Sequence, residues 1–102
     1  PTTTPTQTLF LMNSPFVQQQ AESFARRLLA ESGDDTKRIS LAFALAHGRV
    51  PSNLEVSDAL TFLTAYRTKL TALEKPPTND AELAWSSLAR VLLTSNAFLY
   101  VD

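Results

Sequence analysis

The chain has 102 residues, with nine Lys or Arg against ten Asp or Glu and a formal net charge of −1. The absence of cysteine excludes disulfides, thiolate zinc sites, a cysteine nucleophile and covalent haem attachment within this segment. The charges are interspersed without the basic stripe typical of nucleic-acid binding, and no apolar run is long enough to span a membrane. We expect one domain over 1–102, with no nucleic-acid partner, no membrane insertion by this segment and no cofactor in it.

A first helix is expected over residues 5–13, after a linker-like stretch at 1–3. Thr4 and Gln7 have the spacing of a capping box, and Pro5 lies at the first helical position, where its missing N–H is not needed. This helix is apolar on nearly all sides, so we expect other elements to cover it.

A second helix is expected over residues 15–32. Ser14 can cap it ahead of Pro15, and Gly33 lies where a left-handed residue would end it. Its apolar positions recur at helical spacing, at Val17, Ala21, Phe24 and Leu28.

The third helix is expected over residues 35–47. Asp34 and Asp35 lie at its positive end, and Gly48 ends it. The almost continuously apolar run from 39 to 46 is also compatible with a strand, but its alanine content and the flanking caps favour a buried helix.

The fourth helix, expected over 52–74, has the strongest start signal in the chain. Ser52 and Glu55 form a capping box, Pro51 can act as a hydrophobic staple, and the prolines after Lys75 stop the helix. We expect this long helix to be the element against which the others pack.

The fifth helix is expected over 80–94, with Asn79 and Glu82 as its capping box. Asn96 is expected to break or kink it and to leave 97–101 as a short apolar tail. No segment has the period-two pattern of a strand. The sequence therefore predicts an all-α compact bundle of about five helices.

Candidate site residues gather in the connection between the third and fourth helices, where His47, Arg49 and Glu55 lie close in sequence. Arg49 beside a helix start could bind an anion, or it could pair with Glu55, Asp58 or a helix-terminal carbonyl. The structural role is the favoured interpretation. His47 has no nucleophile or orienting carboxylate at a suitable spacing, so a capping or packing role is favoured for it.

No other pattern predicts catalysis. The carboxylate pairs at predicted helix starts are explained by capping and the helix dipole. Trp85 could be a sugar-stacking platform, but its spacing among leucines favours a core position. One histidine and no cysteine leave a transition metal without ligands. We therefore expect no catalytic or metal site within this segment, and whether it is part of an enzyme stays open.

Three stretches spread over nearly the whole chain resemble one known family. The opening TPTQTLFLMNSPFV from Thr4 resembles P-x-Q-x-L-x-L-x-N-x-P-F-V, Arg49-Val50-Pro51 with Glu55 resembles R-x-P-x-x-x-E, and LLTSNAFLYV from Leu92 resembles L-L-N-S-N-E-F-L-Y-V. These motifs are those of a planctomycete C-terminal domain of unknown function. Thr94 and Ala97 depart from the ending, which has Asn and Glu there.

The resemblance implies a segment that closes a large exported bacterial protein, and therefore an extracytoplasmic location, periplasmic or cell-surface. It also implies another domain of unknown function upstream, often with a cytochrome c-like or lectin-like module. The abrupt start at Pro1 agrees with a fragment of a longer chain. We expect a non-catalytic helical domain that packs against upstream domains or a protein partner. The alternatives are part of an extracytoplasmic polysaccharide- or redox-linked enzyme with its catalytic residues upstream, and a small-ligand or peptide-binding module near Arg49.

Overall fold

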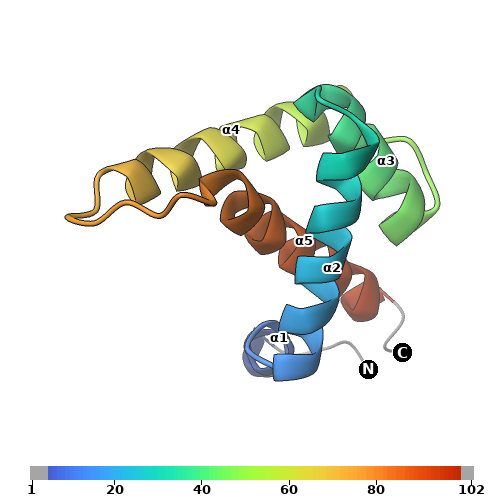
Figure 1. The fold of residues 1–102 in the computed structure, drawn as a ribbon. Helices are drawn as coiled ribbons and strands as arrows, with labels where there is room; N and C mark the ends of the chain where they lie inside the picture. Colours follow the sequence, from blue (N-terminus) through green and yellow to red (C-terminus); the bar gives the residue numbers. More distant parts are fainter. Residues whose placement is uncertain (1–4, 100–102) are drawn as a thin grey trace.

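The computed structural model describes the backbone of residues 5–99 and the side chains of residues 9–95. In that range the chain forms five α-helices and no strand: α1 (Pro5–Met12), α2 (Pro15–Glu31), α3 (Asp35–His47), α4 (Asn53–Thr71) and α5 (Asp80–Leu99). The predicted all-α bundle is confirmed. Figure 1 shows α1 at the end where α2 begins, and α4 extending away together with the loop that leads into α5.

The expectation that the fourth helix is the central element is wrong, because α5 has that place. Among the described residues, α5 contacts all the other helices, whereas α4 contacts only α3 and α5. Residues 84–89 of α5 are buried without interruption. Alanines and serines at four of these positions let neighbouring helices approach α5 from several sides. The outer face of α4 carries exposed threonines instead, at Thr61, Thr64, Thr68 and Thr71.

One hydrophobic core joins α2, α3, α4 and α5. Its largest fully buried side chains are Trp85, Leu28 and Ile39, from three different helices. Truncating a buried leucine or isoleucine to alanine typically costs about 2–5 kcal/mol, so these positions contribute much of the stability of a small domain. Trp85 has the core position that its spacing predicted.

The caps around α3 and α4 agree with the sequence. Asp34 accepts a hydrogen bond from the Thr36 amide at 3.2 Å. Gly48 has left-handed φ and ψ of 68° and 24°, and its N–H donates to the Ala44 carbonyl. Ser52 and Glu55 form both hydrogen bonds of the capping box. Because each of these groups satisfies a helix-terminal amide or carbonyl from a few residues away, local sequence is sufficient to predict them.

The expected end of the second helix needs correction. α2 ends at Glu31, and Ser32, not a left-handed Gly33, is its C-cap in extended geometry. Arg38 of α3 satisfies the end of α2, donating from Nε to the Ser32 carbonyl at 2.6 Å and from Nη2 to the Leu29 carbonyl at 3.4 Å. Gly33 is therefore not needed in the left-handed region. At the start of α2, Ser14 is the N-cap residue, but its side chain makes no capping hydrogen bond.

The last two helix ends also differ from the prediction. α4 ends at Thr71, before residue 74, and the Thr68 and Thr71 hydroxyls donate to the carbonyls of Thr64 and Thr68 in its last turns. α5 continues through Asn96 to Leu99, so residues 97–99 are helical and not part of a tail. A single asparagine in a helix costs less than about 1 kcal/mol relative to alanine, too little to end it without a proline or glycine nearby.

Two expectations for the chain ends lie partly outside the described residues. The expected Thr4–Gln7 cap and the expected tail residues 100 and 101 lie outside the described residues, because the described backbone covers 5–99. The expected covering of the first helix is wrong for Leu9 and Phe10, which are exposed although α1 contacts α2 and α5.

Candidate functional site

Arg49 and Glu55 form a bidentate ion pair across the connection between α3 and α4. Nη1 of Arg49 lies 2.7 Å from Oε1 of Glu55, and Nη2 lies 2.7 Å from Oε2. Oε1 also accepts a hydrogen bond from the Ser52 amide at 2.9 Å. One carboxylate therefore closes the capping box of α4 and holds the arginine that follows α3. Among the partners that the sequence offered for Arg49, Glu55 is the one with which it forms an ion pair.

These contacts change the acid–base properties of both groups. The pKa of Glu55 falls from 4.5 to about 2, first because Arg49 donates to the charged carboxylate and second because the Ser52 amide does so. The hydrogen bond to Glu55 raises the pKa of Arg49. Glu55 is thus ionised at neutral pH and poorly suited to donate a proton. An anion binding at Arg49 would have to compete with this carboxylate.

Phe43 brings His47 and Arg49 together. The His47 ring stacks on Phe43 with a centroid distance of 5.6 Å and an interplanar angle of 29°, and Arg49 Cζ lies 5.6 Å from the Phe43 centroid. Both ring nitrogens of His47 are buried and have no hydrogen-bond partner among the described residues. His47, Arg49 and Glu55 therefore lie around one connection, but His47 is placed by packing and has no described carboxylate to orient it for proton transfer.

A second polar cluster, which sequence analysis missed, centres on Asp35 at the start of α3. Its Oδ1 accepts from Trp85 Nε1 of α5 at 3.1 Å and from Arg38 Nη1 at 2.9 Å. Arg67 of α4 lies 3.7 Å from Asp35 Oδ2 and 3.7 Å from Asp80 Oδ2. From sequence alone, Asp35 is expected only to interact favourably with the dipole of the third helix. Arg38 is a local partner three residues along α3, but Trp85 and Arg67 come from distant segments that no local spacing indicates.

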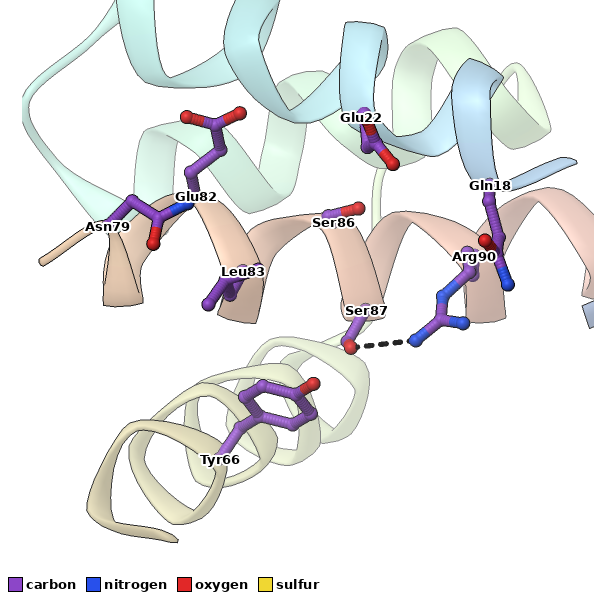
Figure 2. Close-up of a pocket in the computed structure, with 9 residues that line it drawn as sticks. All are labelled: Gln18, Glu22, Tyr66, Asn79, Glu82, Leu83, Ser86, Ser87 and Arg90. Atoms are coloured by element: carbon purple, nitrogen blue, oxygen red, sulfur yellow. Dashed lines mark hydrogen bonds between the residues drawn. The ribbon is translucent and has the colours of Figure 1, made fainter. Parts of the chain in front are cut away.

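A polar groove lies along α5 between α2 and α4, with a volume of about 330 Å³. Figure 2 shows Glu22 reaching from α2 toward Ser86, and Tyr66 reaching from α4 toward α5. Arg90 Nη2 donates to Ser87 Oγ at 3.1 Å on the floor. The residues that line the groove are Gln18, Glu22, Tyr66, Asn79, Glu82, Leu83, Ser86, Ser87 and Arg90. We refer to this set as the α5 groove.

Sequence analysis missed the α5 groove because its polar positions look like a solvated helix face. The one available signal is the line of polar residues Glu82, Ser86 and Arg90 at steps of four on α5, with Asn79 just before the helix. The described residues contain no group of three or more His, Asp or Glu placed to hold a metal ion. They also contain no helix long and apolar enough to cross a membrane.

The fold and these contacts define a small all-α domain in which ion pairs and caps fix the helix connections. The chain belongs to the family PSD1, described as a protein of unknown function (DUF1553), whose model matches residues 1–63. The motif-based assignment to a domain of unknown function is confirmed at that level. The matched residues include the Arg49–Glu55 pair and end within α4, before α5 begins. No curated protein and no solved structure matches the chain.

Proposed function

We propose that this domain is a non-catalytic packing module of a larger exported bacterial protein, and that it contacts another part of that protein through residues 9–16. The observation that carries this proposal is the exposure of Leu9, Phe10 and Phe16, which are 61%, 75% and 67% accessible. Three large apolar side chains exposed within eight residues favour contact with another surface, because single exposed apolar residues are common but close groups of them are not.

The state of the candidate site residues supports a structural role. Arg49 and Glu55 are engaged with each other and with the start of α4, and His47 packs on Phe43. Their positions explain how the α3–α4 connection is held at a fixed angle. The resemblance of the chain to a planctomycete C-terminal domain supports a place at the end of an exported protein, and therefore an extracytoplasmic location.

Limited proteolysis of the full-length protein tests the packing role. Replacing Phe10 and Phe16 together with serine should weaken the contact, so that the domain is released faster than from the wild-type protein. A matched control replaces Val50 and Leu54 with serine, because these two are also strongly exposed but lie at the α3–α4 connection. Equal release rates for all three proteins would contradict the proposal.

A further inference from the structure

We propose that the α5 groove is a binding site for a neutral saccharide of one or two sugar rings. The proposal is independent of the packing role, because the groove is formed by α2, α4 and α5 and contains none of the residues 9–16. Its volume of about 330 Å³ lies at the small end of the range of about 300–1,000 Å³ that is typical of small-ligand sites.

The floor of the groove carries buried hydroxyl groups. Ser86 and Ser87 are only 9% and 5% exposed. Ser87 Oγ accepts a hydrogen bond from Arg90, and the nearby buried Thr94 donates to the Arg90 carbonyl at 2.7 Å. Ser86 also lines the groove, and its hydroxyl is not among the buried side-chain atoms that lack a hydrogen-bond partner. A serine hydroxyl can both donate and accept a hydrogen bond, so Ser86 offers a polar occupant one contact on this floor.

The groove offers both donors and acceptors at close range. The carboxylates of Glu22 and Glu82 accept hydrogen bonds, Arg90 donates them, and the hydroxyls of Tyr66 and Ser86 do both. Each sugar hydroxyl is itself a donor and an acceptor, so it can use such a mixed set. A phosphate or other polyanion would meet two carboxylates, which disfavours it. A purely apolar ligand would displace water from these polar groups without replacing the hydrogen bonds that water makes to them.

Tyr66 gives the groove an aromatic wall. Its ring stacks on Phe62 with a centroid distance of 6.0 Å and an interplanar angle of 27°, so a neighbour on α4 holds its orientation. Figure 2 shows the Tyr66 hydroxyl directed toward α5. A tyrosine side chain combines an apolar ring with a polar tip, which suits a sugar ring with its C–H groups and hydroxyls.

Amide NMR titration of the chain with cellobiose, maltose, xylobiose and chitobiose tests the proposal. Concentrations should reach about 10 mM, tenfold above a weak Kd of about 1 mM. We expect at least one disaccharide to shift the amide signals of residues 83–90, together with those around Glu22 and Tyr66. The proposal is overturned if none of the four shifts these signals, or if the shifts fall elsewhere. It is also overturned if free lysine or inorganic phosphate binds the groove and the sugars do not.

Substitutions at the rim of the groove then locate the binding groups. Glu22→Gln removes a charged acceptor without changing its size, and should raise the Kd of the bound disaccharide about tenfold or more. Tyr66→Phe keeps the ring and removes only the hydroxyl, so it should weaken binding less. The matched control is Glu31→Gln, at another exposed carboxylate of α2 outside the groove. Equal effects of the substitutions at Glu22 and Glu31 would overturn the assignment, provided the amide spectra show the folded chain.

Discussion

The indole Nε1 of Trp85 donates a hydrogen bond to Oδ1 of Asp35 at 3.1 Å, across 50 positions of sequence. Trp85 is fully buried in α5, and this bond satisfies the one polar atom of its side chain. Asp35 also accepts from Arg38, which in turn caps the end of α2. A single carboxylate at the start of α3 therefore connects the central helix to the ends of two others.

Asp35→Ala should lower the free energy of unfolding by about 2–3 kcal/mol, because hydrogen bonds to charged groups are worth about 1.5–3 kcal/mol and the half-buried Arg38 loses its carboxylate partner. Asp35→Asn keeps an oxygen acceptor for Trp85 and should lose only about 1 kcal/mol. Urea denaturation measures both. Asp58→Ala, at an exposed carboxylate on α4, serves as control and should stay within about 0.5 kcal/mol of the wild type.

Equal losses in the alanine and asparagine variants of Asp35 would contradict this account. They would show that the charge, and not the acceptor for Trp85, carries the contribution. A loss for Asp35→Ala no larger than that of the Asp58 control would show that the cluster has no net effect on stability.

Much of the helical organisation could be predicted from sequence because it depends on local chemistry. The capping box of Ser52 and Glu55 and the left-handed Gly48 involve groups within a few residues of each other. Gly33 shows the limit of such reasoning. It has the same residue type after a helix as Gly48, but Arg38 from the next helix satisfies the end of α2 and makes a left-handed residue unnecessary.

In the candidate site, too, contacts between residues close in sequence could be predicted and contacts between distant residues could not. Pairing of Arg49 with Glu55 was among the predicted alternatives, since only six positions separate them. The Trp85–Asp35 bond and the pair of Arg26 with Glu82 join residues 50 and 56 positions apart. The central place of α5 is also non-local. In the sequence, its serines have the pattern of a solvent-exposed polar face, and only the packing of α2 and α4 against α5 buries them. The α5 groove could therefore not be predicted.

The two glycines make a matched pair for backbone substitution. Gly48→Ala should cost about 1–2 kcal/mol, because alanine disfavours the left-handed φ of 68°. Gly33→Ala should instead stabilise the domain by about 0.4–1 kcal/mol, since Gly33 has no positive φ and alanine reduces the entropy of the unfolded chain. A Cβ at either position meets no atom within 4 Å, so clashes do not confuse the comparison. Thermal unfolding should move the two midpoints in opposite directions, and a shared direction would contradict the backbone explanation.

His47→Phe should leave stability unchanged or raise it by about 1 kcal/mol. Phenylalanine keeps a ring against Phe43 and removes two buried nitrogens that have no partner among the described residues. His47→Ala loses the stacked ring and should cost about 1–2 kcal/mol. Chemical denaturation of both variants separates the contribution of the stacked ring from that of the two ring nitrogens. A loss above about 1 kcal/mol for His47→Phe would show that a ring nitrogen makes a stabilising hydrogen bond in solution.

The Arg49–Glu55 pair should give the domain an acid-dependent contribution to stability. The folded pKa of Glu55 is about 2, below its ordinary value of 4.5, so the folded state favours the ionised carboxylate. This contribution is complete above the unfolded pKa and is lost as the pH falls from about 4.5 toward about 2. The difference in unfolding free energy between the wild type and Glu55→Gln should therefore be largest near neutral pH and should decrease as the pH falls. Urea denaturation at a series of pH values measures it.

Two further variants identify the cause of this pH dependence. Arg49→Gln removes the first of the two hydrogen bonds that lower the pKa of Glu55, and the Ser52 amide still favours the charged carboxylate. The difference in unfolding free energy between this variant and the wild type should therefore also decrease in acid, but by a smaller amount than for Glu55→Gln. Glu31→Gln changes the net charge equally at an exposed position on α2. Added salt should reduce the effect of both Arg49 and Glu55 variants, since the pair is partly exposed to solvent. A difference between wild type and Glu55→Gln that is constant from neutral pH to pH 2 would show that the ion pair does not lower the pKa of Glu55 in solution.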